Sequence, residues 1–145
     1  MSNFKDERSK KEERYIRYGK DIVDNFDVED DLTFWKLKSE TTKNGYLIEM
    51  IHPEVSALCP VSNFADSGKI TIRYVPNKKT VELKSLKLYI NSYRNIGISH
   101  EDLANDVFNN LEKGLKPKYL QVVLEMAPRG NVTTIITVDT KKRKY

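Results

Sequence analysis

The order in which the spacing of apolar residues changes along the chain constrains its fold more than any other feature. Apolar and polar residues alternate in 69–76, which is typical of a strand. Apolar residues then recur at helical spacing in 81–94 and again after Ser99, before alternation returns in 119–126 and 131–139. With strands on both sides of two helices, the predicted order is β-β-α-α-β-β. This order predicts an α+β protein, an antiparallel sheet with both helices on one face.

Strands are also expected before residue 69. Residues 33–39 alternate, Asn44-Gly45 is the strongest hairpin-turn dipeptide in the sequence, and 46–51 is the expected returning strand. The stretch 52–68 is then expected to form a long loop, and a connection of that length is usually functional or disordered. The preceding segment, 21–32, is acidic and shows no period.

The boundaries of the second helix follow from its sequence. Ser99 is expected to be the N-cap, with Asp102 three residues on as a variant of the capping box. Leu103 begins an apolar stripe that continues through Val107 and Leu111. Gly114 is expected to end the helix.

Charge is concentrated at the two ends of the chain. The 145 residues carry a net charge of +4, the size is that of one domain, and both 1–20 and 139–145 have a local excess of three positive charges. We expect a charged extension over 1–30, a single folded domain over 31–140 and a basic tail over 141–145. Because the remaining body is nearly neutral, direct tRNA binding is not expected.

Composition favours the cytoplasm. One cysteine excludes an intramolecular disulfide framework, which indicates a reducing compartment. Two histidines and one cysteine are too few for a zinc site unless carboxylates or a second chain contribute, so no metal is expected. No apolar run approaches the roughly 18 residues that cross a bilayer, and the N-terminal residues lack the apolar region of a secretory signal. We therefore expect a soluble cytoplasmic protein.

Two residues of the expected long loop are candidates for chemistry. Cys59 precedes Pro60, which places it outside any helix. A lone cysteine is more often a small buried hydrophobe, and Asp66 is more often a turn former. The functional alternative is a nucleophilic thiol with Asp66 as proton donor.

Charged residues on the two helices also admit two interpretations. Glu101, beside His100, either stabilises the helix dipole or faces a cleft as a bidentate acceptor for two parallel N–H donors. Lys84 and Lys87 share a helical face that is either solvated or a phosphate clamp, with Arg129 as a third cation. The six glycines are too widely spaced for any Gly-rich nucleotide loop.

Four motifs together closely resemble those of the NADPH-dependent 7-cyano-7-deazaguanine reductases, the nitrile reductases of queuosine biosynthesis. The motif E-[SL]-K-[SA]-hydrophobic-K-[LY]-aromatic is matched at every position from Glu82 to Tyr89. The other matches are Cys59-Pro60 with Asp66, His100-Glu101, and Pro128-Arg129-Gly130. The resemblance covers roughly residues 50–131. The family's tunnelling fold (T-fold), shared with GTP cyclohydrolase I, has the same β-β-α-α-β-β order.

The resemblance implies a mechanism. The Cys59 thiolate would add to the nitrile of 7-cyano-7-deazaguanine to form a thioimide, and Asp66 would donate a proton to the nitrile nitrogen. NADPH would then reduce this intermediate. A helix N-terminus or a nearby cation would lower the pKa of the thiol. The implied substrate-binding residues are Val81, Glu82, Leu83, His100 and Glu101, and those implied to bind the phosphates of NADPH are Lys84, Lys87 and Arg129.

The resemblance also implies assembly. Short members of the family join sheets edge to edge into rings, and two rings stack, so a decamer with sites between subunits is expected; closing the sheets removes exposed edges.

Two alternative functions remain. One is an archaeosine-type amidinotransferase acting without NADPH on nitrile-bearing tRNA, which the basic tail would suit. The other is a ring-forming binding module without catalysis. The intact Glu82–Tyr89 motif argues against the first, and the joint presence of Cys59 and Asp66 argues against the second.

Overall fold

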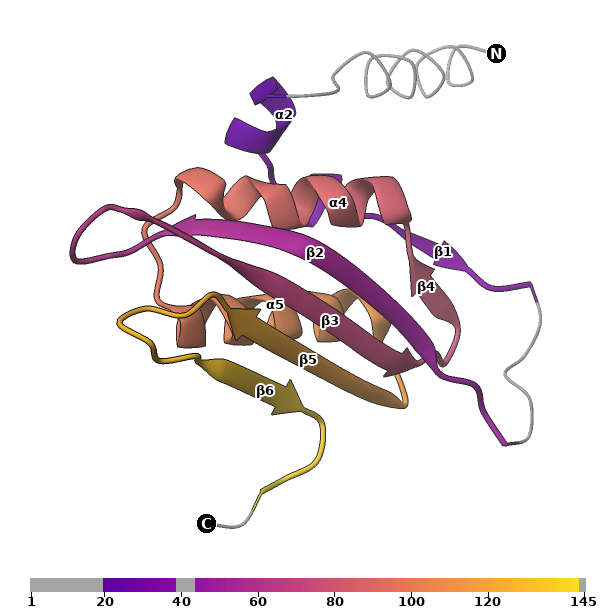
Figure 1. Ribbon diagram of the computed structural model, residues 1–145. Helices are drawn as coiled ribbons and strands as arrows, with labels where there is room; N and C mark the ends of the chain where they lie inside the picture. The colour runs from indigo at the N-terminus through magenta and orange to yellow at the C-terminus, as the bar shows by residue number, and fades with distance from the viewer. Residues whose placement is uncertain (1–19, 39–43, 144–145) are drawn as a thin grey trace, which may run out of the picture.

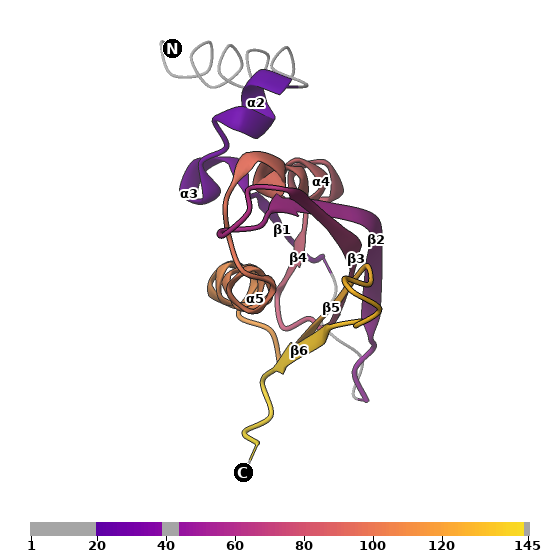
Figure 2. The same cartoon turned by 60° about the vertical axis from the view of Figure 1, so that its left-hand side comes forward.

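The main sheet has four antiparallel strands in the order β2-β3-β5-β6 (Figure 1). The structure, a computed structural model, describes residues 20–38 and 44–143. Both long helices lie on the same face of the sheet (Figure 2). The bounds are β2 Ile48–Leu58, β3 Ala65–Val75, β5 Tyr119–Met126, β6 Ile135–Asp139, α4 Leu83–Asn91 and α5 His100–Leu115. The α+β prediction is confirmed.

The core lies between this sheet and the two helices. Every second residue of β5 is buried, as is the helix-facing side of β3, which includes Ile70 and Ile72. The predicted stripe of α5 is also buried; it consists of Leu103, Val107 and Leu111. Among the described residues, no helix is long and apolar enough to cross a membrane.

The predicted hairpin at Asn44-Gly45 is wrong. The first strand, β1 (Phe34–Lys36), pairs with β4 (Lys79–Val81) in a separate two-stranded sheet instead of with β2. Two contacts tie β1 to the start of α4. The Ser85 hydroxyl accepts from the Thr33 N–H at 3.0 Å, and the Glu82 N–H donates to the Thr33 carbonyl at 2.9 Å. These long-range contacts decide the pairing of β1, which the local turn signal does not.

The predicted long loop over 52–68 is also wrong, because most of it is strand. β2 continues to Leu58 and β3 begins at Ala65, which leaves a short loop, 59–64. A bulge after His52 shifts the β2–β3 register by one residue and turns Val55 inward. Pro53, at the bulge, is tolerated because β2 is an edge strand.

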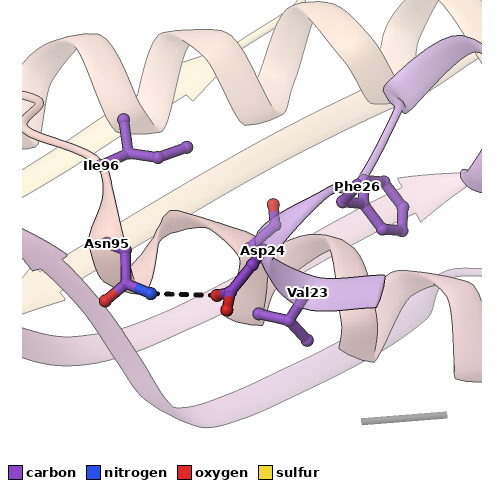
Figure 3. Close-up of a pocket in the computed structure, with 6 residues that line it drawn as sticks. Val23, Asp24, Phe26, Asn95 and Ile96 are labelled. Atoms are coloured by element: carbon purple, nitrogen blue, oxygen red, sulfur yellow. Dashed lines mark hydrogen bonds between the residues drawn. The ribbon is translucent and has the colours of Figure 1, made fainter. Parts of the chain in front are cut away.

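Two short helices occupy the segment that was expected to be aperiodic: α2 (Lys20–Asp24) and α3 (Val28–Asp31). Asp24 accepts hydrogen bonds from Arg94 at 3.2 Å and from Asn95 at 3.0 Å, beside a pocket of about 180 Å³ (Figure 3). These contacts fasten α2 to the 3-10 turn that follows α4, η1 (Ser92–Asn95). Residues 1–19, which include most of the expected charged extension, lie outside the described residues.

The ends of three elements differ from prediction. α4 begins at Leu83, later than expected, because Glu82 is its N-cap. α5 begins after the predicted N-cap, Ser99, but it runs through Gly114 and ends before Lys116, which is left-handed (φ 47°). The last strand starts at 135 instead of 131.

Candidate active site

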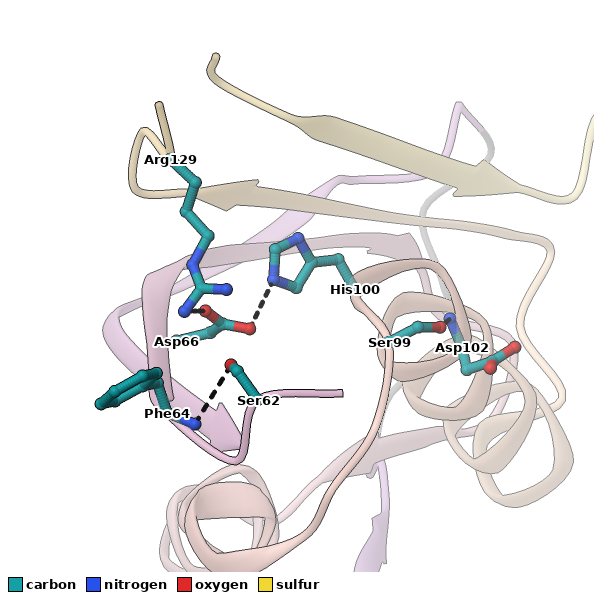
Figure 4. A network of polar contacts seen from close by, with 7 residues as sticks. All are labelled: Ser62, Phe64, Asp66, Ser99, His100, Asp102 and Arg129. Carbon is teal, nitrogen blue, oxygen red and sulfur yellow. Dashed lines mark hydrogen bonds and ion pairs between the residues drawn. The ribbon is translucent and has the colours of Figure 1, made fainter. Parts of the chain in front are cut away.

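Four candidate residues gather at one end of the main sheet, which we call the hairpin end. The hairpin end consists of the 59–64 loop, the start of β3, the β5–β6 turn and the start of α5 (Figures 1 and 4). Chain direction explains the gathering, because β2 and β5 both finish there and β3 and α5 both begin there. The residues that it brings together are Cys59, Asp66, His100 and Arg129.

Asp66 is the buried centre of the hairpin end. Its side chain is 4% exposed and lies between two cationic or ionisable partners (Figure 4). Nε2 of His100 lies 3.0 Å from Oδ2, and Nη2 of Arg129 lies 2.5 Å from Oδ1. The Arg129 contact is an ion pair, and Oδ1 receives no well-aligned hydrogen bond from the described residues. Because Asp66 is a buried strand residue, it is not a turn former.

Cys59 begins the 59–64 loop as the cap of a single helical turn. Its carbonyl accepts from the Asn63 N–H at 2.9 Å, and its own N–H donates to the Phe64 carbonyl at 2.8 Å. The left-handed Asn63 (φ 62°) closes the turn. Pro60 occupies the first position of this turn, where a missing N–H carries no penalty. The next two amides, those of Val61 and Ser62, are therefore directed at the sulfur, as in an N-cap.

The sulfur of Cys59 is partly exposed and is surrounded by donors. A hydrogen bond from the Ser62 side chain, with the amides of Ser62 and Val61 and the Arg129 side chain adding to it, lowers the pKa of the Cys59 thiol from 9.0 to about 7. Much of the thiol is therefore thiolate at neutral pH. The expected nearby cation is present as Arg129. Ser62, however, was not a sequence candidate, although Cys-Pro-x-Ser has the pattern of a capped turn.

Arg129 reaches Asp66 because of the strand register. The ladder between β3 and β5 extends past Met126, where the Ala127 N–H donates to the Ser67 carbonyl at 2.8 Å. Two hydrogen bonds of 2.9 Å then close the tip between Arg129 and Val132. Arg129 was expected at a phosphate, but in this chain it lies with Asp66 and Cys59.

The start of α5 supplies His100 and Glu101. Ser99 caps the helix by accepting from the Asp102 N–H at 3.1 Å. The capped turn aims His100 at Asp66 and leaves Glu101 exposed. Among the described residues, no hydrogen bond or ion pair engages the Glu101 carboxylate. It can therefore accept two parallel donors from a ligand, and the positive end of the helix dipole stabilises its charge.

The other candidate substrate-binding residues lie at the opposite end of the sheet. Glu82 caps α4, because its carboxylate accepts from the Lys84 N–H at 2.8 Å and from the Ser85 N–H at 2.7 Å. Val81 is buried in β4, and its N–H lies 3.4 Å from the Tyr74 hydroxyl. The side chains of Glu82 and Val81 are thus engaged within the chain.

Within the 82–89 motif, only the outward-facing residues can contact a ligand. Ser85 and Tyr89 are buried, and Tyr89 accepts a hydrogen bond from Asn110 at 2.7 Å. Leu83 is 66% exposed and Lys87 is also exposed, one turn away on the same face. Lys87 borders a groove of about 300 Å³ between β2 and α4. The other residues that line the groove are Met50, Ile51, His52, Pro53, Ile72, Leu83, Leu86 and Ile90.

The separation between the two ends exceeds the size of a single base. Asp66 and Tyr74 are eight residues apart on one strand, which corresponds to about 26 Å. The Tyr74 hydroxyl, 2.6 Å from that of Thr80, marks the end where Val81 lies. One chain therefore does not bring Cys59 and Val81 to the same small ligand.

Comparison with known proteins assigns this arrangement to a family. A family model described as "QueF-like protein" matches residues 65–145. The NADPH-dependent 7-cyano-7-deazaguanine reductase of Sulfurimonas denitrificans is 49% identical over 127 residues, which is 88% of this chain and 99% of that protein. The chain belongs to the 7-cyano-7-deazaguanine reductase family. The reductase of Wolinella succinogenes is 44% identical over the same shares of the two chains.

The fold of the family is also seen in a solved structure. The crystal structure of the archaeosine synthase QueF-Like in the apo form aligns with a TM-score of 0.62, and the alignment covers 68% of this chain and 96% of that one. At 22% sequence identity this likeness concerns the fold alone. Together with the observed strand order it confirms the T-fold expected for a reductase of this family.

Proposed function

We propose that this chain reduces the nitrile of 7-cyano-7-deazaguanine to an aminomethyl group with NADPH, in the cytoplasm, as a step of queuosine biosynthesis. The observation that carries the proposal is that Arg129 contacts both Cys59 and Asp66, so that a nucleophile and a proton-transfer group share one small site. The relatives that bear this activity in their names match 88% of this chain.

The first step is covalent. The Cys59 sulfur adds to the nitrile carbon, one C–N π bond breaks, and a thioimide forms. The nitrile nitrogen takes up one proton, which Asp66 takes from solvent and delivers, because Cys59 reacts as the thiolate. The hydrogen bond from His100 holds Asp66 in position for both transfers.

Recognition of the base falls to the start of α5. The exposed Glu101 carboxylate accepts the N1–H and the 2-amino group of the deazaguanine, while His100 lies beside it. The backbone around Val81, Glu82 and Leu83 contacts the same base from a neighbouring chain. A site built on such donor–acceptor pairs rejects bases that lack the donors, because its own polar groups would be left unpaired.

The residues at the start of α4 fit the cofactor. Lys84 and Lys87 are separated by one turn of α4, and Lys87 borders an apolar groove, which suits a diphosphate next to flat rings. When bound, NADPH supplies hydride, and two such equivalents convert a nitrile to an amine. Arg129 supplies the third cation. Because it lies at the hairpin end, it joins the two lysines only across a subunit contact.

Assembly follows from this separation. β2 and β6 are the edge strands of the main sheet, so copies joined edge to edge leave no open edge. We propose stacked rings, with a decamer as the assembly, in which the hairpin end of one protomer faces the α4 start of another. Each active site then contains residues from two chains.

The test mixes the purified protein with 7-cyano-7-deazaguanine and NADPH. We expect NADPH oxidation, and without NADPH a 1:1 covalent adduct in the intact mass; Cys59→Ala abolishes both. An adduct without any NADPH oxidation would overturn the reductase in favour of an amidinotransferase. The absence of an adduct would leave only a binding module.

A further inference from the structure

The Arg129 side chain lies with Asp66 and Cys59 in the chain without any ligand. Its guanidinium forms the ion pair with the buried Asp66, and the same side chain contributes to lowering the pKa of the neighbouring Cys59 thiol. The phosphate-binding role leaves these contacts unexplained, because a residue that served only a cofactor would need no buried partner in the free protein.

The shape of the β5–β6 turn positions Arg129 beside Asp66. The turn that carries Arg129 is closed by reciprocal hydrogen bonds with Val132 and turned by Gly130 (φ 52°) and Asn131 (φ 66°). The Arg129 side chain remains 47% exposed, so it reaches Asp66 from the solvent side, opposite to His100 (Figure 4). Asp66 is thus held on both oxygens, by groups from two different elements.

We propose that Arg129 is a positioning residue of the reacting pair, with its guanidinium orienting Asp66 and stabilising the Cys59 thiolate before any cofactor binds. The inference rests on the proposed function only in identifying Cys59 and Asp66 as the reacting pair. It assigns Arg129 a second role, beyond contact with phosphate. A guanidinium suits this role because its planar fork contacts two anionic groups at once.

The charges around Cys59 at the hairpin end come from several elements. Asp66 begins β3, His100 and Glu101 begin α5, and Arg129 lies on the β5–β6 turn. Arg94, on the nearby η1 turn, is paired with Asp24. Among the described residues, Arg129 is therefore the cation that contacts the sulfur.

The test measures the thiol directly. Cys59 is the only cysteine, so its alkylation by iodoacetamide can be followed by intact mass across a range of pH, without nitrile or NADPH. Arg129→Gln is expected to move the midpoint of the alkylation profile upward by a few tenths of a pH unit, because the Ser62 and Val61 donors, which lower the pKa of Cys59 more strongly, remain. Arg129→Lys, which keeps the charge but not the fork, is expected to fall between the two. The matched control is Lys113→Gln, which removes an exposed cation from the last turn of α5, at the opposite end of that helix from His100.

A shift in Arg129→Gln with none in Lys113→Gln supports the proposal. A profile for Arg129→Gln that superimposes on that of the native protein overturns it, and so does an equal shift in both variants, which would indicate net charge. Because Arg129→Gln leaves the buried Asp66 with His100 as its remaining charged partner, a lower temperature of thermal unfolding is expected, and the alkylation profiles are compared at a temperature at which all variants are folded. The readout needs no turnover, so failure of nitrile reduction and failure of this inference are separate results.

Discussion

The ring of Phe34 occupies the space in which a side chain at Gly114 would begin. A Cβ at position 114 would lie 2.0 Å from the ring, closer than real atoms approach. This contact joins β1, the strand from the N-terminal part of the chain, to the last turn of α5. Glycine is therefore required at position 114 because it leaves room for the Phe34 ring, and it does not terminate the helix.

Gly114→Ala is expected to destabilise the protein. Overpacking against Phe34 outweighs the better helix propensity of alanine, for a net loss of about 2 kcal/mol in the free energy of unfolding. Chemical denaturation measures it. In a Phe34→Ala background the obstacle is gone, and the same substitution is expected to stabilise by roughly 0.5–1 kcal/mol. The same sign in both backgrounds would show that Phe34 is not the cause.

Ser62→Ala is expected to raise the pKa of the Cys59 thiol. The Ser62 hydrogen bond is the largest cause of the lowered value, about 7 against 9.0, so its loss shifts the titration toward alkaline pH. Alkylation at neutral pH should slow by about three- to tenfold, because less thiolate is present. Well above both pKa values, the native protein and the variant should react alike. Ser62→Thr keeps the hydroxyl and should retain the native profile; equal rates for Ser62→Ala at neutral pH would contradict the role of Ser62.

Glu101→Gln is expected to weaken binding of 7-cyano-7-deazaguanine by roughly a hundredfold. Two charge-assisted hydrogen bonds are lost, and the amide presents a donor where the base also presents one. Calorimetry in a Cys59→Ala background measures the affinity without covalent trapping. Asp102→Asn, in the same exposed turn, is the control and should bind like the background protein. Unchanged affinity of Glu101→Gln would remove Glu101 from the site.

Mixing two inactive variants tests the shared site. Cys59→Ala disables the hairpin end, and a Lys84→Glu, Lys87→Glu double variant disables the α4 start. If each site combines the hairpin end of one chain with the α4 start of another, co-assembled protein should recover about a quarter of the native activity. In an equal random mixture half of the hairpin ends and half of the α4 starts are intact, so about one site in four contains both intact. The same variants assembled separately and then combined are the control. No recovery in the co-assembled protein would place both ends of each site on one chain.

Regular spacing allowed much of the fold to be predicted. Alternation placed β5 with its observed bounds, and the Ser99 cap placed the start of α5. The errors involve partners distant in sequence. The Asn44-Gly45 turn signal is local, whereas β1 pairs with β4 because Thr33 is bonded to Ser85. For the site, motif matching identified Cys59, Asp66, His100 and Arg129, but it did not identify Ser62 or the contact between Arg129 and Asp66.

The amino-acid sequence by itself determined the order of elements and the burial of the α5 stripe, because period and capping act within a few residues of the chain. It also supplied the candidates for the reactive side chains. The tertiary structure alone decided that Arg129 meets Asp66 and that Val81 lies at the far end of the sheet. Strand register sets those separations, and register depends on residues that meet only after the chain has folded.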